Sequence, residues 1–393
     1  LSQKETPDEN YAREVQELFT VGKRPFAKFT ESDVREIARA LVGWSHDYDK
    51  IVYEEGHENL PVFYPWNHDV GDKFFSSFYG NRVIRGKEGQ SGANELQEVV
   101  DMLFDTEENS IYIARRLYQF FVYPALTDEI EENIIKPLAK VYRDNNYSLT
   151  EPLKVLLKSQ HFFENQIQNS LIKSPIEYSM SILKEVDLIN EGIAHHWDGS
   201  NTKYSLFDPE YFGEKEKDLS FFKYHITDFI NGYYGEDLGL SITFPPSVSG
   251  WPAFYQEPVY DLFWINSSTL NRRINLVNEF LRWGVWLNIF IGDNGVQRKF
   301  NLINYLKTFE NPRSISEFID ELVFRFLGGE ASENIKNKIF QALLGDLNED
   351  HWSEEINNLI NSTSSAEQSY SNIDWRLGNA FEIMGQTGEF HLF

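Results

Sequence analysis

The chain has 393 residues, of which 41% are hydrophobic and 15% aromatic, so it can bury a sizeable core and is not disordered throughout. Its 61 acidic and 36 basic side chains leave a formal net charge of -25, which repels phosphate backbones and anionic lipid headgroups. We therefore expect no nucleic-acid partner. The chain has no cysteine, which excludes disulfides and thiolate chemistry, and no apolar run long enough to predict a transmembrane span.

Helix-start signals recur along the whole chain. In the pattern Ser/Thr-x-x-Glu/Asp, the hydroxyl and the acid satisfy free backbone amides reciprocally, which makes a capping box. Such patterns precede helix-period apolar residues and begin at Thr6, Thr30, Ser148, Ser174 and Ser314. Periodicity predicts further helices over 94–104, 108–122, 129–143, 151–159, 175–188, 219–231, 269–290, 314–326, 332–344, 352–361 and 373–384.

Strand signals are few. Residues 51–53 and 61–64 predict two short strands that could form a small hairpin. The stretches 192–217 and 235–264 are long, irregular and rich in aromatic residues, and long loops of this kind are more often functional than passive. We therefore predict a mainly all-α fold with long irregular loops and at most a small β-hairpin near 51–64.

The domain organisation follows from the helices. We expect one multi-helical domain over residues 1–393. A possible subdivision separates an N-terminal helical part, 1–190, from an irregular loop region, 191–268, and from C-terminal helices, 269–393.

The motif best suited to chemistry is the stretch 68–73, His-Asp-Val-Gly-Asp-Lys, in the loop after the predicted hairpin. His68 and Asp69 are residue types that bind a divalent metal or act as acid and base, and Lys73 could neutralise an anion. These three are the catalytic candidates, and His68 and Asp69 are also the metal candidates. The alternative is structural: Asp69 caps a turn and His68 packs on Trp66.

Other possible ligands lie in the same irregular region, namely His46, Asp47, Asp49 and His57. Their spacing is not diagnostic, because no His-x-x-x-His helix motif accompanies them. Phosphate-loop, serine-nucleophile and dinucleotide-binding fingerprints are missing from the sequence as well. A divalent metal is therefore the only cofactor that the sequence suggests.

Two helix motifs contain a cation. Arg13, in Asn-Tyr-Ala-Arg-Glu, either reaches a polar site or pairs with Glu17 one turn later on the surface. In the motif 173–177, Lys-Ser-Pro-Ile-Glu, helix capping explains the serine, the proline and the glutamate. It leaves Lys173 unexplained.

A loop rich in proline spans residues 244–252, Phe-Pro-Pro-Ser-Val-Ser-Gly-Trp-Pro. The adjacent Pro245 and Pro246 fix φ and prevent both helix and central strand, while Trp251 offers a large apolar face. Such a rigid aromatic loop can form the wall of a binding groove, or it can pack on the helices as a plug.

These motifs, with Ala-Arg-Ala at 38–40 and Gly-Trp at 43–44 between them, stand in an order that resembles the bacterial family catalogued as domain of unknown function 1800. The resemblance covers nearly all of the chain. It implies a mostly helical, exported protein, and hence an extracytoplasmic location that is periplasmic, cell-surface or secreted. No activity is established for the family, so the resemblance implies no reaction.

The chain departs from the family pattern in two ways. Family members carry a further helical region before Asn-Tyr-Ala-Arg-Glu, which implies that this chain is N-terminally incomplete or cleaved. The missing part would then be a separate chain and a possible partner. Phe19 also stands where the family often has a histidine, so a metal site that used this histidine would be incomplete here.

Two functions of different classes follow. The first is a binding or scaffold component of a cell-envelope or secreted system, whose partners are proteins of an envelope complex or polysaccharide. Its expected binding residues are Arg13, Arg39, Trp44, Pro245, Pro246 and Trp251. The alternative is a metal-assisted hydrolase around His68 and Asp69, with Lys73 or Arg39 as the electrostatic partner.

Overall fold

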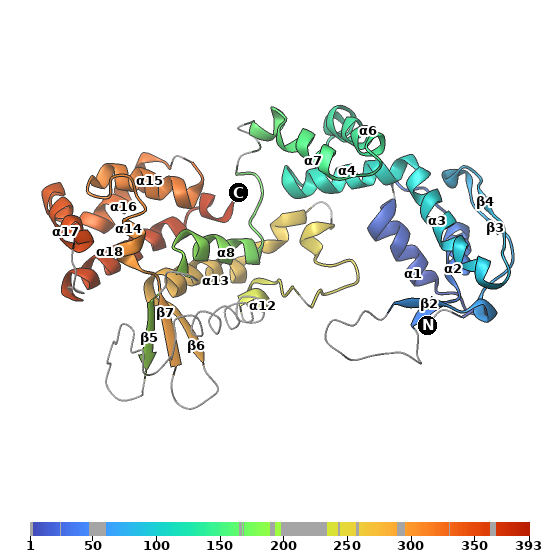
Figure 1. The fold of residues 1–393 in the computed structure, drawn as a ribbon. Coiled ribbons are helices and arrows are strands. Elements are labelled where there is room, and N and C mark those ends of the chain that lie inside the picture. The colour runs from blue at the N-terminus through green and yellow to red at the C-terminus, as the bar shows by residue number, and fades with distance from the viewer. Residues whose placement is uncertain are drawn as a thin grey trace. The chain divides into compact units, whose positions relative to one another are not determined.

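The computed structural model describes the chain in twelve stretches. They are residues 3–23, 25–46, 60–164, 167, 169–188, 193–197, 234–242, 244–256, 259–288, 295–329, 331–361 and 367–393. The fold is mainly α-helical, as predicted, and forms two compact units, Leu1–Glu164 and Asn165–Phe393 (Figure 1). This division lies before the possible boundary at residue 190 that the sequence suggested.

Unit 1, Leu1–Glu164, is built from helices and two small antiparallel ribbons. Its helices are α1 (Glu9–Glu14, continued by a π-helical turn, Val15–Thr20), α2 (Glu31–Leu41), α3 (Asn94–Asp105), α4 (Glu107–Phe121), α5 (Asp128–Ile130), α6 (Lys136–Asp144) and α7 (Thr150–Leu157). Its strands are β1 (Trp44–His46), β2 (Pro61–Phe63), β3 (Lys73–Phe74) and β4 (Val83–Ile84). Apolar side chains of α1, α2 and α3 meet in one core.

The capping boxes have mixed outcomes. At the start of α2, Thr30 accepts a hydrogen bond from the Asp33 amide, and the Asp33 carboxylate accepts one from the Thr30 amide at 2.7 Å, as predicted. At α1 the prediction is wrong, because Asp8 and not Thr6 caps the helix. The expected reciprocal boxes at Ser148 and Ser314 do not form, although the Ser148 hydroxyl accepts a hydrogen bond from the Thr150 amide at 3.4 Å.

The predicted hairpin has a different partner strand. β2 pairs antiparallel with β1, so that Trp44 lies opposite Phe63, and the connection between them is longer than the sequence suggested. The expected partner at 51–53 lies outside the described residues. The second ribbon pairs β3 with β4 and was not predicted.

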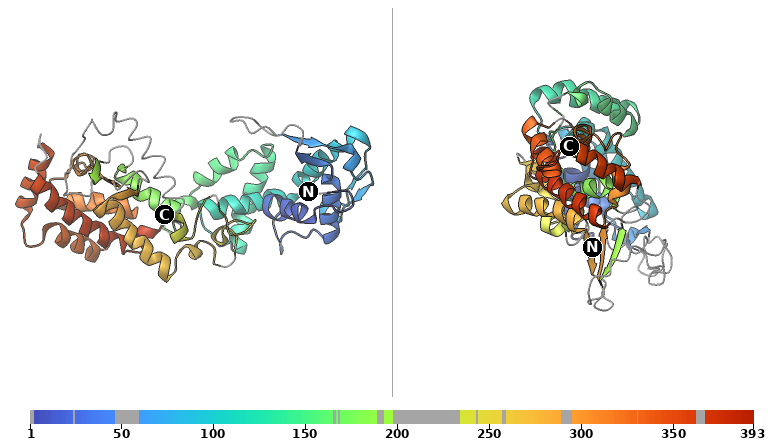
Figure 2. Two further views of the ribbon diagram at one scale, coloured as in Figure 1. Left: turned by 90° about the horizontal axis from the view of Figure 1, so that it is seen from below. Right: turned by 90° about the vertical axis from the view of Figure 1, so that its left-hand side faces the viewer.

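Unit 2, Asn165–Phe393, contains further helices and, in its described residues, a three-stranded sheet. Its helices are α8 (Pro175–Glu185), α12 (Gly235–Leu238), α13 (Ser267–Val277, continued by a π-helical turn, Asn278–Trp283), α14 (Leu302–Leu306), α15 (Ile315–Leu327), α16 (Glu333–Leu344), α17 (Glu349–Asn361) and α18 (Glu367–Gly385). Figure 2 shows α15, α16, α17 and α18 gathered in one bundle at the red end of the chain. This bundle contributes much of the unit 2 core, which also includes α8 and α13.

The three-stranded sheet corrects two predictions. Its strands are β5 (Ile193–Trp197), β6 (Val285–Asn288) and β7 (Gly295–Lys299), in the antiparallel order β5-β7-β6. The predicted helix 269–290 therefore ends at Trp283, where Gly284 takes a φ of 81° and turns the chain into β6. The stretch 192–217 was predicted to be irregular, and β5 lies in it. The helix predicted over 219–231 lies outside the described residues.

The beginning and end of unit 2 are hydrogen-bonded to each other. Ile172 and Leu392 form an antiparallel bridge, the Lys173 amide donates to the His391 carbonyl at 2.9 Å, and the Phe393 amide donates to the Leu171 carbonyl. We call this pairing of 171–173 with 391–393 the strap. Among the described residues, no helix has the length and apolarity needed to cross a bilayer.

Candidate functional site

The loop 68–73 is attached to α2 through Arg39. The Arg39 Nε and Nη2 atoms donate to the two oxygens of Asp69 at 2.9 and 3.1 Å, and Nη1 donates to Glu36 at 2.6 Å. The Gly71 amide also donates to Asp69, so this carboxylate closes a tight turn, as the structural alternative predicted. Burial opposes ionisation of Asp69, but the bonds from Arg39 and Gly71 outweigh it and lower the pKa of the carboxyl.

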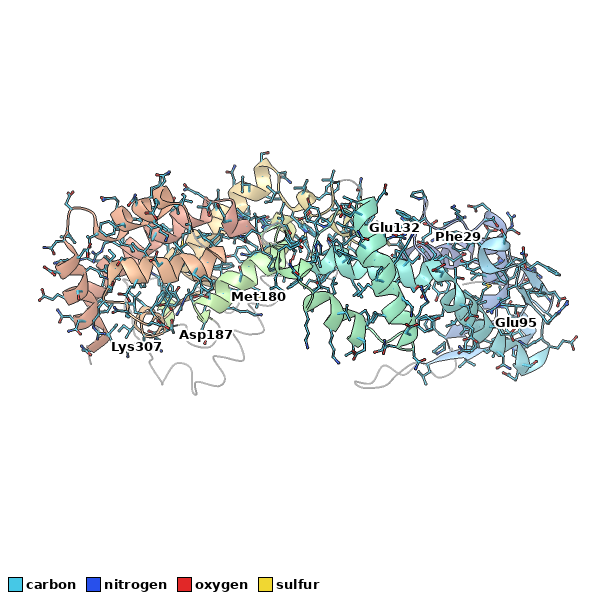
Figure 3. All side chains as sticks on the ribbon, turned by 90° about the horizontal axis from the view of Figure 1, so that it is seen from above. Phe29, Glu95, Glu132, Met180, Asp187 and Lys307 are labelled. Carbon is cyan, nitrogen blue, oxygen red and sulfur yellow. The ribbon has the colours of Figure 1, made fainter. Side chains whose placement is uncertain are left out.

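His68 and Lys73 meet at a third residue, Glu95, which the sequence analysis had not singled out. All three side chains are fully or almost fully buried, and Figure 3 labels Glu95 on α3. Lys73 Nζ donates to Glu95 Oε2 at 2.5 Å and to the Asp69 carbonyl, and the Lys87 amide donates to Glu95 Oε1. We call His68, Lys73 and Glu95 the neutralised cluster, because its buried carboxylate lies against its buried ammonium.

The His68 ring is held from both sides. Its Nδ1 lies 2.7 Å from the Val42 carbonyl and donates to it, and the ring packs edge-on against Phe63 rather than on Trp66. Nε2 lies 3.1 Å from Glu95 Oε1, but without the alignment of a hydrogen bond. The backbone leaves little space here, since a Cβ on Gly92 would lie 2.6 Å from His68 Cδ2.

A metal does not fit these residues. Both oxygens of Asp69 are held by Arg39, His68 Nδ1 is bonded to a carbonyl, and the ammonium of Lys73 already occupies Glu95. Within the described stretches, no group of three or more His, Asp or Glu side chains is placed to hold an ion. His46 lies exposed at the end of β1, and Asp47, Asp49 and His57 lie outside the described residues.

Arg13 and Trp44 lie in unit 1 and make contacts outside the neutralised cluster. Arg13 pairs with Glu31 at the start of α2, through two hydrogen bonds of 2.9 and 2.5 Å, so it joins α1 to α2 rather than bonding to Glu17. Trp44 packs on Phe63 with 5.4 Å between ring centroids, and its Nε1 is buried with no hydrogen-bond partner in the described structure. Both residues thus have structural contacts.

The loop 244–252 belongs to unit 2 and is attached to a small aromatic core. Trp251 is partly buried and packs on Phe254, which in turn packs on the buried Trp264 at 5.5 Å. Pro245 and Pro246 are exposed. The Trp251 end of the loop therefore packs as a plug, one of the two alternatives that the sequence left open, and the groove-wall alternative stays a prediction for the exposed proline end.

A second buried cluster lies in unit 2 at the strap. It contains Lys173, Arg273 of α13, and His391, and we call it the cationic cluster. Lys173 Nζ donates to the Phe390 carbonyl at 3.1 Å, and Arg273 Nη2 donates to the Lys173 carbonyl at 2.7 Å.

The ring of Tyr178 contacts two members of the cationic cluster. His391 stacks on it at 5.3 Å between ring centroids, and the Arg273 guanidinium carbon lies 4.8 Å from the Tyr178 centroid. The Tyr178 hydroxyl also donates to the Arg273 carbonyl at 2.9 Å. This tyrosine thus fixes the place of both side chains from α8.

Burial perturbs every member of the cationic cluster. Desolvation, with the charge of Arg273 added, lowers the pKa of Lys173 to about 8 and that of His391 to about 4. Desolvation also lowers the pKa of Arg273 to about 10, although Tyr178 and Glu177 oppose it. All three shifts disfavour the charged form, which is the signature of cations without a buried counter-charge.

One sequence signal could have found both clusters. Glu95 precedes the buried Val99 and Met102 by four and seven residues. Arg273 likewise precedes the buried Val277 and Phe280 by four and seven residues, so each charged residue lies on the buried face of its helix. A charged residue at a core position of an amphipathic helix is rarely buried without a partner. In the motif around Lys173, capping explained the neighbouring residues and left the lysine itself without a role.

Comparison with known proteins adds one match. A family model whose description is "Protein of unknown function (DUF1800)" matches residues 1–390. No curated protein and no solved structure matches the chain.

Proposed function

The chain belongs to the DUF1800 family of proteins of unknown function, and from that premise we propose that it is a binding or scaffold protein of the bacterial cell envelope. Its proposed contact surface is the part of unit 2 between residues 244 and 263. The observation that carries the proposal is a set of large apolar side chains exposed on segments anchored to a packed aromatic core.

We give the name apolar loop surface to four exposed apolar side chains on two segments that are attached to the same core. Phe244 and Val248 are 75% and 74% exposed, and Leu262 and Phe263 are exposed as well. Large exposed apolar side chains that gather on one region mark interaction sites more often than isolated ones do. The two segments that carry them are both attached to the core of Trp264.

Hydrogen bonds hold both segments that carry this surface. Residues 247 and 250 close a turn through the Gly250 amide, which donates to the Ser247 carbonyl at 2.9 Å, with Gly250 at a φ of 87°. The Asp261 carboxylate accepts from the Ile172 amide at 2.8 Å, which fixes the second segment to the strap. A preorganised surface loses less conformational entropy on binding, so it suits a docking role.

The chemistry of the surface favours a protein over a polysaccharide. Its four side chains are phenylalanine, valine and leucine, which offer neither hydroxyl nor indole N–H to a sugar. A protein partner with an apolar patch and a basic rim would complement both this surface and the net charge of -25. The extracytoplasmic location is part of this proposal and rests on the resemblance described above.

The hydrolase alternative has less support. Of the groups it requires around His68 and Asp69, only His68 Nε2 makes no hydrogen bond, and one buried nitrogen is no donor set for an ion. We therefore do not propose it.

The test uses a crosslinking amino acid at position 248 in the bacterium, followed by binding measurements with the purified partner. The double substitution Phe244→Ser and Val248→Ser should weaken binding at least tenfold while leaving the midpoint of unfolding unchanged, because both side chains are exposed. The matched control, Phe324→Ser, removes an exposed phenylalanine of α15 and should bind like the wild type.

Two results would contradict the proposal. A purified partner that binds the double variant and the wild type equally would show that this surface is not the contact. Retention of the wild-type protein on neutral glucan or peptidoglycan, lost in the double variant, would show instead that the surface binds polysaccharide.

A further inference from the structure

The cationic cluster of unit 2 lacks a carboxylate. Arg273 is 0% exposed, and Lys173 and His391 are buried, yet no ion pair joins any of them to an acid in the described part of the chain. Glu177 attracts Lys173 and Arg273 from a distance, but its carboxylate accepts from the Ser174 amide at 2.8 Å in the capping box of α8. The cluster is thus a buried positive region.

Several of its donors are unused. Arg273 Nε and Nη1 have no hydrogen-bond partner, and neither ring nitrogen of His391 has one. The Gly385 carbonyl favours the protonated form of His391 but lies outside hydrogen-bonding geometry. A buried donor left unsatisfied costs about 1–3 kcal/mol, and more for a charged group, so the two guanidinium nitrogens of Arg273 and the N–H of the His391 ring need an explanation.

The other buried arginines in the described stretches are paired with acids. Arg115 in unit 1 is bonded to Glu108 and Glu131, and Arg376 in unit 2 is bonded to Glu355. Arg272, next to Arg273 on α13, pairs with Asp237 and Glu279. Arg273 departs from this rule of the chain, and the departure points to a ligand that supplies the negative charge.

We infer that Arg273, Lys173 and His391 form a buried binding site for a small inorganic oxyanion such as phosphate or sulfate. A guanidinium offers charged N–H donors on both of its edges, and an oxyanion is the acceptor that it matches best. A neutral imidazole adds one more N–H. A water molecule would satisfy a donor but would leave the charge uncompensated.

The site would connect three parts of unit 2 that are far apart in sequence: the segment just before α8, the middle of α13, and the 3-10 turn Glu389–His391. Because its members are buried, the anion would enter only when the strap opens locally. This inference is independent of the apolar loop surface and adds a ligand to the molecule rather than a partner.

The first experiment measures the midpoint of thermal unfolding in chloride, phosphate and sulfate buffers of equal ionic strength. Above its dissociation constant, phosphate should raise the wild-type midpoint by roughly 4 °C per tenfold increase in concentration, as linkage requires. Arg273→Met should abolish this response. The matched control Arg272→Met removes a neighbouring arginine that has carboxylate partners, and it should keep the response.

A second measurement tests the inference even if the anion stays bound throughout purification or the Arg273→Met variant does not fold. Ion chromatography of the solution released by denaturing gel-filtered wild-type protein should then find about one phosphate or sulfate per chain. The inference is overturned if no anion is released and the wild-type midpoint is the same in all three buffers. It is also overturned if Arg273→Met responds to phosphate as the wild type does, since the effect would then come from general exclusion of the salt.

Discussion

Each unit buries a histidine and a lysine, but only one unit supplies an acid for them. In unit 1, Glu95 lies between Lys73 and His68, and the cluster is neutral as well as buried. In unit 2, Lys173 and His391 share their surroundings with Arg273, and the cluster is positive. The first arrangement is complete and holds a loop, whereas the second is incomplete without a further charge. Charged residues in a core are thus evidence for a site only after their partners are counted.

The largest expected effect comes from removing the acid of the neutralised cluster. Glu95→Gln leaves the Lys73 ammonium buried without a counter-charge and should lower the free energy of unfolding by about 3–5 kcal/mol. Chemical denaturation measures the loss. Glu98→Gln is the control, because it removes the partly exposed partner of Lys87 and should cost less than about 1 kcal/mol. A loss as small as that of the control would contradict the comparison, because Glu95 would then not be the acid that neutralises the unit 1 cluster.

Acid should affect the cationic cluster through His391. With a pKa of about 4 in the folded unit and an ordinary value of 6.5 when unfolded, the ring binds more protons in the unfolded chain between these values. Stability should therefore fall as pH falls from 6.5 to 4, by up to about 3 kcal/mol. His391→Phe keeps an aromatic ring against Tyr178 and should remove this fall in chloride buffer. His351→Phe, at an exposed histidine, should leave it unchanged.

Alkali should affect the same cluster through Lys173. Its pKa of about 8 means that the folded unit releases the proton while the unfolded chain, with the ordinary value of 10.5, retains it. Stability should therefore rise between pH 8 and 9.5 in chloride by about 2 kcal/mol, and Lys173→Met should lose this rise. Lys307→Met, at an exposed lysine, is the control. A bound anion favours the charged lysine, so an equal rise in phosphate would speak against the oxyanion site.

The smallest expected effect comes from the bidentate pair of hydrogen bonds between Arg39 and Asp69. Arg39→Lys keeps the charge but loses one of two parallel hydrogen bonds, and should cost about 1 kcal/mol in chemical denaturation. The same change at Arg13, whose partner Glu31 is largely exposed, should cost no more than about 0.5 kcal/mol. Equal losses at the two positions would show that the turn 68–73 needs no fixed partner.

Local signals predicted the parts of the fold that depend on local contacts. The capping boxes at Thr30 and Ser174, and the helices after them, are present because each box is closed within four residues. The turn at Asp69 is likewise closed by the amide of Gly71 two residues later. The paired hydrogen bonds from Arg39 to Asp69 join residues 30 positions apart, and the sequence indicated Arg39 as a binding residue or an electrostatic partner without assigning it to Asp69.

Contacts between residues that are far apart in the sequence could not be predicted. Lys73 meets Glu95 22 residues later, and Arg273 contacts Lys173 100 residues earlier, and no spacing rule covers either pair. β6 was also missed, because the apolar stretch that contains it continues the helix period of α13 until Gly284 ends it. At this point the positive φ of Gly284 ends the helix and starts the strand.

The strap has a consequence for the order in which the molecule folds. The Lys173 side chain bonds to the Phe390 carbonyl 217 residues away, whereas the Lys73 to Glu95 bond spans 22. Closing a loop about ten times longer costs roughly 2 kcal/mol more in chain entropy, and this cost comes before the contacts that offset it have formed. Contacts of long sequence separation form slowly, so we expect the strap to close late, after unit 1 has enclosed its own charges. Until then Arg273 faces water, and any anion that unit 2 retains would be captured in this interval of folding.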